Sequence, residues 1–139
     1  MSVTLGGASF EVQVRSAFEV MAQAYAPYSR FRVGALLVAG DGTEFRGCNV
    51  ENSSFPAGLC AERAALSAAV ASGQQRFSLL VVATEATKAT PPCGLCRQAL
   101  VEFAPDLPVV SVTSGGDRGM WRLSELLPFP FTPDSLTHS

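Results

Sequence analysis

Cysteine and glutamate are the side chains whose spacing in this sequence points most clearly to chemistry. They form two groups, Cys60-Ala-Glu62 and Cys93-Gly-Leu-Cys96. Thiolates are preferred zinc ligands, and three of them leave the fourth tetrahedral position of the ion to water, as catalytic sites do. Water bound to zinc ionises near neutral pH. Glu62 lies two residues from a ligand, where its carboxylate can exchange protons with that water. The pattern therefore indicates metal-assisted hydrolysis.

The same residues allow other interpretations. Cys48 could complete a structural four-cysteine zinc site, but one sheet residue would have to reach two helix starts, so we expect a buried thiol there instead. Cys93 and Cys96 alone could form a redox pair at a helix start. Glu62 alone could be a first-turn glutamate favoured by the helix dipole. The combination of both cysteine groups with the glutamate favours the catalytic site.

Two predicted helices place these cysteines. One covers residues 60–72, which are dense in Ala, Leu, Glu and Arg before Gly73, and the other begins near Gly94 and ends near Phe103. The positive end of a helix dipole and its free N–H groups lower the pKa of a cysteine, which prepares the thiolate for a metal. Both cysteine groups are therefore expected at helix starts.

The remaining elements follow from hydrophobic patterns. Apolar residues three and four apart predict a helix over 10–26, which Pro27 ends, and apolar runs predict strands at 31–39, 43–50, 77–84, 109–113 and 120–123. The proline-rich segment 127–133 is predicted to be neither helix nor central strand. This order predicts an α/β fold of three layers, α/β/α, with a mixed five-stranded sheet in a single domain over residues 1–139.

Several motifs resemble those of the small, homo-oligomeric, zinc-dependent cytidine deaminase family. Two of them contain the cysteine groups, Cys60-Ala-Glu-Arg63 and Pro92-Cys-Gly-Leu-Cys-Arg-Gln98. The resemblance continues through Tyr28-Ser-Arg-Phe-Arg-Val-Gly-Ala35, Gly47-Cys-Asn-Val-Glu-Asn52 and Leu126-Leu-Pro128, and so covers nearly the whole chain. In the wider superfamily, a cysteine is an accepted first ligand beside the Pro-Cys-x-x-Cys pair.

The resemblance implies a reaction and roles for five residues. Cys60, Cys93 and Cys96 would hold Zn²⁺, and Glu62 would carry a proton from zinc-bound water to ring nitrogen N3 and then to the departing amine. Arg63 would donate hydrogen bonds to the cysteine sulfurs and offset their negative charge. The products would be uridine or deoxyuridine and ammonia, in pyrimidine salvage.

The resemblance also implies a nucleoside site. Asn49 and Glu51 would bind the ribose hydroxyls, Phe31 would lie beside the pyrimidine, and the backbone of Ala61 would contact its carbonyl. Phe131 would come from a neighbouring subunit, so the active sites would be shared in a homo-oligomer, expected to be a tetramer. Taken alone, Asn49 and Glu51 would favour the simpler role of bracing the loop that follows them.

Two positions depart from the family pattern. Phe55 stands where many relatives have a tyrosine that reaches the sugar 5′ oxygen, and Thr132 replaces the usual glycine after the tail aromatic. Phe129 and Phe131 could also be structural anchors. The nearest alternative function is deamination of another aminopyrimidine nucleoside such as blasticidin S. A structural-zinc interaction module is the non-enzymatic alternative.

Composition limits the partners further. With 139 residues, 47% of them hydrophobic, the chain can bury one substantial core, and its low charged fraction of 16% favours a homo-oligomer. A formal net charge of -2 provides no basic surface for a nucleic acid polymer. We see no membrane span and no targeting pattern, so we expect a cytoplasmic protein with reduced cysteines, and a solvated His138.

Overall fold

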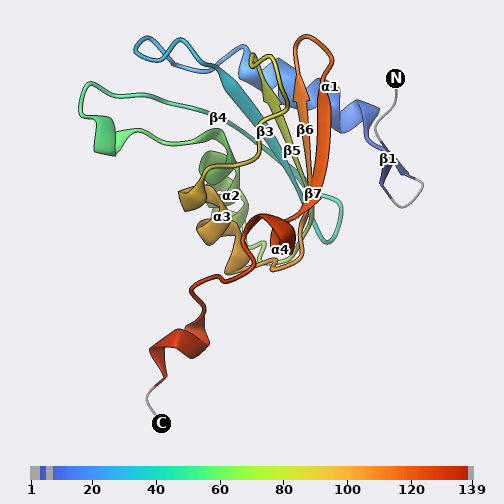
Figure 1. The fold of residues 1–139 in the computed structure, drawn as a ribbon, viewed down its shortest axis with the longest axis vertical. Helices are drawn as coiled ribbons and strands as arrows, with labels where there is room; N and C mark the ends of the chain where they lie inside the picture. Colours follow the sequence, from blue (N-terminus) through green and yellow to red (C-terminus); the bar gives the residue numbers. More distant parts are fainter. Residues whose placement is uncertain (1–3, 6–7, 138–139) are drawn as a thin grey trace.

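A mixed five-stranded sheet lies at the centre of the computed structural model, which describes residues 4–5 and 8–137 (Figure 1). The strand order is β4-β3-β5-β6-β7. Strands β5 and β6 are parallel, whereas the other neighbours in the sheet are antiparallel. The strands are β3 (Val33–Ala39), β4 (Glu44–Cys48), β5 (Phe77–Thr84), β6 (Pro108–Thr113) and β7 (Arg118–Arg122).

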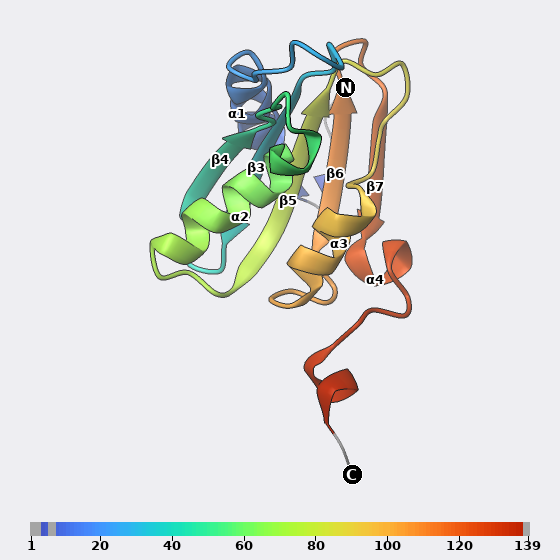
Figure 2. The same ribbon diagram turned by 90° about the vertical axis from the view of Figure 1, so that its left-hand side faces the viewer.

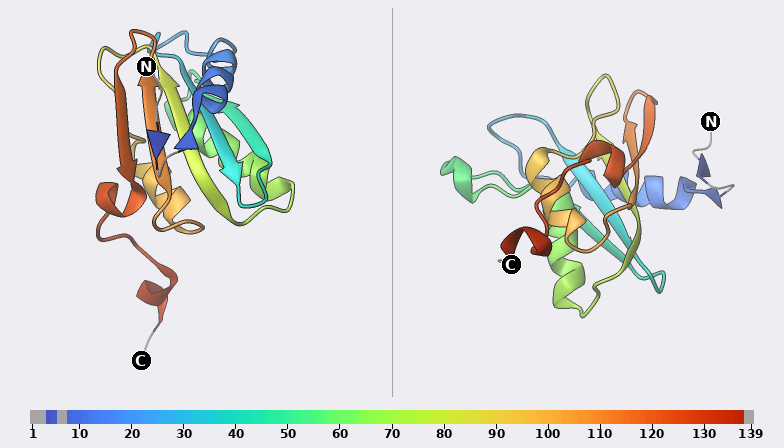
Figure 3. Two further views of the ribbon diagram at one scale, coloured as in Figure 1. Left: turned by 90° about the vertical axis from the view of Figure 1, so that its right-hand side faces the viewer. Right: turned by 60° about the horizontal axis from the view of Figure 1, so that its bottom comes forward.

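Helices cover both faces of this sheet. Helix α1 (Glu11–Met21) lies on one face, and α2 (Ala61–Ala71) and α3 (Gly94–Val101) lie side by side on the other, as the opposite views in Figures 2 and 3 show. The three-layer α/β/α fold with a mixed five-stranded sheet is therefore confirmed. The shorter elements are β1 (Thr4–Leu5), β2 (Ala8–Ser9), α4 (Leu123–Leu126) and the 3-10 helices Phe55–Ala57 and Pro133–Leu136.

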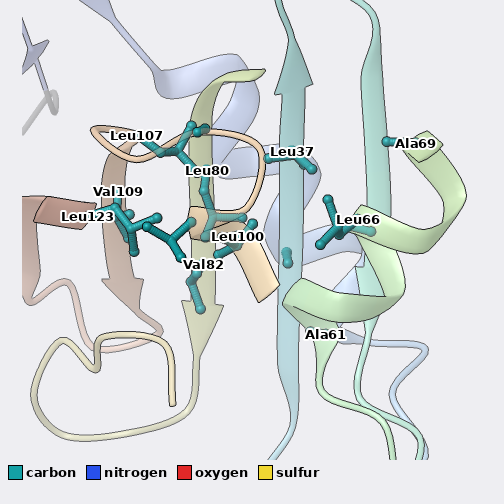
Figure 4. Close-up of a cluster of buried hydrophobic side chains, with 14 residues drawn as sticks. Leu37, Ala61, Leu66, Ala69, Leu80, Val82, Leu100, Leu107, Val109 and Leu123 are labelled. Atoms are coloured by element: carbon teal, nitrogen blue, oxygen red, sulfur yellow. The ribbon is translucent and has the colours of Figure 1, made fainter. Parts of the chain in front are cut away.

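The central strands supply apolar side chains to both helical layers. Because neighbouring side chains of a strand point to opposite faces, Leu80 and Val82 of β5 pack toward α2 and α3, whereas Leu79 and Val81 pack toward α1. Figure 4 shows the first of these clusters, in which Ala61 at the start of α2 packs with the sheet. This packing explains why residues 77–84 form a continuous apolar run.

Two glycines allow helices to approach the sheet closely. A Cβ atom added to Gly47 of β4 would overlap Ala61 O and lie 2.5 Å from Ala65 N. At Gly34 of β3, an added Cβ would overlap Ala17 O and lie 2.7 Å from Met21 N. Backbone atoms cannot move aside as the end of a side chain can, so these glycines set the distance of α2 and α1 from the sheet.

Two sequence predictions need correction, the end of the first helix and the burial of Cys48. The first helix ends at Met21 rather than near residue 26, because Tyr25 instead pairs with the segment after β4: Tyr25 N donates to Asn49 O, and Glu51 N donates to Tyr25 O. Cys48 is partly exposed rather than buried. The short helix α4 was not predicted.

His138 lies outside the described residues. Within the described part of the chain, no helix is both long enough and apolar enough to span a bilayer.

Candidate active site

Two helix starts bring three cysteines together. Cys60 is the N-cap of α2 and Cys93 the N-cap of α3, both with extended backbone, and Cys96 lies in the first turn of α3. The Sγ atoms of Cys60 and Cys93 are 3.8 Å apart, those of Cys93 and Cys96 are 3.5 Å apart, and the three lie within 4.8 Å of one another. Among the described residues, Cys48 is not part of this group. The structure thus separates the fourth cysteine from the other three.

Hydrogen bonds within the cluster favour a thiolate at Cys60. Hydrogen bonding to Cys96 and to Arg63, whose guanidinium nitrogen lies 3.6 Å from Cys60 Sγ, lowers the Cys60 pKa to about 5. The Cys60 thiolate, followed by burial, raises the pKa of Cys96. Three thiols packed this closely share protons, and a divalent cation replaces those protons when it binds. The donor set of three sulfurs with a guanidinium nearby fits Zn²⁺.

Glu62 lies in the first turn of α2 beside these sulfurs. Its side chain is buried, with 5% of the residue exposed, yet it lines the same cavity as Cys60 and Cys93. Burial, with a smaller contribution from the Cys60 charge, raises the pKa of Glu62 to about 7. A carboxyl group with a pKa near neutrality can both accept and donate a proton at physiological pH. Glu62 is therefore suited to proton transfer.

A cavity of about 440 Å³ opens over the cluster. It brings together most of the residues expected from the sequence: its lining includes Phe31, Asn49, Glu51, Cys60, Ala61, Glu62 and Cys93. Cys96 is fully buried and does not line the cavity. Arg63 does not line it either, but donates a hydrogen bond to Cys60 Sγ. Phe131 does not line the cavity of its own chain; it lies on the C-terminal tail with 58% of its surface exposed.

Asn49 and Glu51 brace the loop that forms one wall of the cavity. Asn49 Nδ2 donates to Phe31 O over 2.8 Å, and Val33 N donates to Asn49 Oδ1 over 2.9 Å. The Glu51 carboxylate accepts hydrogen bonds from Tyr28 N, Ser29 N and the Ser29 hydroxyl. Accepting these bonds lowers the pKa of Glu51, with the Ser29 hydroxyl as the largest cause. Both side chains therefore hold Phe31 and Ser29 in place, and both also face the cavity.

Two residues of this site, Ser29 and Arg97, had no role predicted from the sequence. Ser29 lines the cavity and bonds to Glu51, and its hydroxyl also accepts a hydrogen bond from Phe31 N over 3.0 Å. Arg97 lines the cavity and donates to Pro92 O, at 2.7 Å, and to Leu126 O, at 2.9 Å. Both residues lie inside the motifs that carry the family resemblance, and this position in the sequence could have indicated a role in the site. Their hydrogen-bond partners could not be predicted, because only the folded chain brings them together.

A second hollow of about 390 Å³ adjoins the first, and Ser29 and Glu51 line both. Its wall also includes Tyr28 and Phe55, whose rings meet edge to face with centroids 6.0 Å apart. Phe55 is 75% exposed, although it is a large aromatic residue. An exposed apolar patch of this kind is typical of an interaction site.

A known protein family matches most of this chain. Residues 10–112 match the family model described as the cytidine and deoxycytidylate deaminase zinc-binding region. The chain belongs to this deaminase family. The matched region contains the whole cysteine cluster and Glu62, and the zinc-binding description of the family agrees with the donor set.

Individual deaminases are similar over most of their length. A cytidine deaminase of Sporosarcina psychrophila is 42% identical over 118 residues, which cover 84% of this chain and 87% of that protein. A cytidine deaminase of Halalkalibacterium halodurans is 39% identical over 127 residues, which cover 91% and 96%. The crystal structure of the Burkholderia pseudomallei cytidine deaminase superposes with a TM-score of 0.85 at 41% identity, covering 89% of this chain and all of that one.

Proposed function

We propose that this protein is a cytidine deaminase that hydrolyses cytidine and 2′-deoxycytidine to uridine and 2′-deoxyuridine with release of ammonia. One observation carries the proposal: three cysteine sulfurs within 4.8 Å of one another lie beside a buried Glu62 at the wall of a cavity of about 440 Å³. Relatives 42% and 39% identical that bear the name cytidine deaminase support the substrate.

The chain's own residues divide the chemistry between them. Cys60, Cys93 and Cys96 would hold Zn²⁺, which makes water more acidic and so supplies a nucleophile at neutral pH. Arg63, hydrogen-bonded to Cys60 Sγ, offsets the negative charge of the thiolates. Burial disfavours the ionised form of Glu62, so its carboxylate readily accepts a proton.

Glu62 moves two protons in this scheme. Water adds its oxygen to ring carbon C4, and Glu62 takes the proton that the water loses and delivers it to ring nitrogen N3. Glu62 then takes the proton of the new C4 hydroxyl group and delivers it to the 4-amino nitrogen. The C4–N bond breaks, ammonia leaves, and C4 becomes the carbonyl carbon of uridine. Atoms and charge balance, with cytidine and water giving uridine and ammonia.

The cavity wall would recognise the nucleoside. We assign the ring of Phe31 to the pyrimidine face and the backbone of Ala61 to the base carbonyl, since both line the cavity with Glu62. Asn49 and Glu51 retain unused hydrogen-bonding capacity toward the cavity, because an amide nitrogen has two protons and a carboxylate has about four acceptor sites. We assign both to the sugar hydroxyls.

We further propose that one domain over residues 1–139 assembles as a homotetramer with shared active sites, in the cytoplasm, for pyrimidine salvage. Two exposed aromatic rings support subunit contacts: Phe55, at the second hollow, and Phe131, on the tail.

Mixing two variant subunits tests whether active sites are shared between neighbouring subunits. Inactive Glu62→Gln subunits should restore activity to Phe131→Ala subunits after co-refolding, because mixed pairs contain one intact site. No gain over the separate variants would contradict a contribution of Phe131 in trans.

A substrate panel tests the activity itself. Zinc-replete protein is given cytidine, 2′-deoxycytidine, cytosine, blasticidin S and a cytosine-containing single-stranded oligonucleotide, and ammonia release is measured. We expect turnover of the two nucleosides and little of the others. Turnover of blasticidin S without cytidine would support the alternative deaminase, and turnover of none, with zinc bound, would support a structural zinc site.

A further inference from the structure

The side-chain amide of Gln98 pairs with the backbone of Phe131. Gln98 Nε2 donates to Phe131 O over 2.7 Å, and Phe131 N donates to Gln98 Oε1 over 3.2 Å. One amide group thus occupies both hydrogen-bonding groups of one residue's backbone, as a neighbouring strand would in a sheet. Gln98 lies on α3, two residues after Cys96.

The C-terminal tail has few other attachments to the body of the protein. Arg97 donates to Leu126 O at the end of α4, and residues 127–137 then run away from the sheet and helices (Figures 1 and 2). Among the described residues, the two hydrogen bonds of Gln98 are those that join segment 128–137 to the body. Phe129 and Phe131 on this segment are 92% and 58% exposed.

We infer that Gln98 is a positioning residue: its amide fixes the backbone at Phe131 and thereby sets where the Phe131 ring is presented to a neighbouring subunit. The inference rests on the proposed function, in which Phe131 completes a neighbour's nucleoside site. We call these two hydrogen bonds between the Gln98 amide and the Phe131 backbone the clamp. The clamp uses only the backbone of Phe131, so the exposed ring stays free to contact another chain. Ordering the tail beforehand lowers the conformational entropy lost when the site is completed.

Both ends of the amide are needed for this clamp. Gln98→Met keeps the length of the side chain and removes both hydrogen bonds. Gln98→Glu keeps an acceptor for Phe131 N but replaces the donor with a carboxylate oxygen that faces Phe131 O. Gln75→Met is the matched control, since Gln75 is exposed and its side chain forms no hydrogen bond within the described part of the chain.

The first measurement is amide hydrogen exchange at Phe131, which does not depend on activity. In Gln98→Met, exchange of the Phe131 amide should be about tenfold or more faster than in the wild type, because one protecting hydrogen bond is lost. Gln75→Met should leave it unchanged. Unchanged exchange in Gln98→Met would overturn the clamp.

The second measurement is a double-mutant cycle in KM and kcat for cytidine. Gln98→Met should raise KM about three- to tenfold with a smaller change in kcat, because a misplaced ring weakens binding of substrate and transition state alike. In the background of Phe131→Ala, Gln98→Met should add little, since a positioning residue acts through the ring that is already gone. Gln98→Glu should give an intermediate KM.

The outcomes separate the two levels of inference. Faster exchange with unchanged KM would overturn the positioning role, because release of the Phe131 backbone would then have no effect on substrate binding. Full additivity with Phe131→Ala would also overturn it, because Gln98 would then act independently of the Phe131 ring. Equal zinc content and equal melting temperature in Gln98→Met and wild type exclude general damage to α3. A wild type that binds zinc and leaves cytidine unchanged would refute the proposed function, and with it the positioning role, while the exchange result still decides the clamp.

Discussion

Cys60 and Glu62 lie two residues apart at the start of α2, and the fold shifts their pKa values in opposite directions. Cys96 and Arg63 lower the pKa of Cys60 to about 5, whereas burial raises the pKa of Glu62 to about 7. A negatively charged ligand and a carboxyl group that exchanges protons near neutrality therefore come from one helical turn. The proposed reaction needs this difference in pKa, because the Cys60 thiolate should bind the metal while the Glu62 carboxyl group transfers protons.

Removing one of the three cysteine sulfurs should greatly weaken zinc binding. We expect Cys93→Ser to lower zinc affinity more than the roughly 10- to 100-fold typical of losing an outer hydrogen-bond partner, because a ligand itself is lost. The helix should remain, since Cys93 is the N-cap of α3 and serine is a favoured N-cap residue. Zinc content after dialysis against a weak chelator is the measurement.

Cys48→Ala is the matched control for that experiment. Cys48 lies at the end of β4 outside the cysteine cluster, so its loss should leave zinc content unchanged. Loss of zinc from Cys48→Ala, with no effect of Glu62→Gln, would instead support a structural four-cysteine site.

Gly47→Ala should push α2 away from the sheet. The added Cβ would lie 2.5 Å from Ala65 N and 2.9 Å from Ala64 Cβ, so the helix must shift. Overpacking of this kind costs about 1–3 kcal/mol in the free energy of unfolding. Because α2 begins at Cys60 and Glu62, zinc affinity should fall as well. Chemical denaturation and zinc titration measure the two effects.

Gly115→Ala is the control for the glycine substitution. An added Cβ at Gly115 meets only ordinary contact, 3.9 Å from Thr113 Oγ1, so the free energy of unfolding should change little. Equal stability of Gly47→Ala and Gly115→Ala would contradict the close approach of α2 to β4.

Glu51→Gln distinguishes sugar binding from bracing of the loop. If Glu51 binds sugar hydroxyls as proposed, the substitution should raise KM for cytidine about tenfold, but should change KM for 2′,3′-dideoxycytidine less than about twofold, because that nucleoside lacks the hydroxyls. Steady-state kinetics with both nucleosides provide the comparison. An equal rise for both would assign Glu51 only to holding Tyr28 and Ser29, the hydrogen bonds seen in the structure.

Glu85 should make stability depend on acid pH. Hydrogen bonds from Arg32 lower the pKa of Glu85, so the folded protein holds fewer protons there than the unfolded chain. The stabilisation is complete above the ordinary glutamate pKa and is lost as the pH falls through the lowered value. Melting temperatures of wild type and Glu85→Gln should therefore differ slightly at pH 7 and converge in acid. A gap that stays constant with pH would contradict this role of the pair.

The sequence predicted the elements that are determined by local patterns. Strand β5 matches its predicted range, 77–84, because the run of apolar residues from Leu79 to Ala83 is typical of a strand buried on both faces. The starts of α2 and α3 were also predicted closely, since a helical composition follows each cysteine group. The extent of α1 was not, because the pairing of Tyr25 with residues after β4 depends on a contact distant in the sequence.

The site was predictable in its residue types but not in its contacts. Spacing identified Cys60, Cys93 and Glu62, and the structure places all three on one cavity. The exposure of Cys48 could not be read from the sequence, because it depends on what covers the end of β4. The hydrogen bonds of Asn49 to Phe31 and of Gln98 to Phe131 also join residues that only the fold brings together.

The most direct test of this account is cytidine turnover by Glu62→Gln, measured together with its zinc content. Glu102→Gln, which removes an exposed glutamate at the end of α3, is the control for loss of a charge. We predict that Glu62→Gln binds as much zinc as the wild type and deaminates cytidine about 100- to 10,000-fold more slowly, the range expected for loss of a general acid-base group. Turnover near the wild-type rate in zinc-loaded Glu62→Gln would contradict the account.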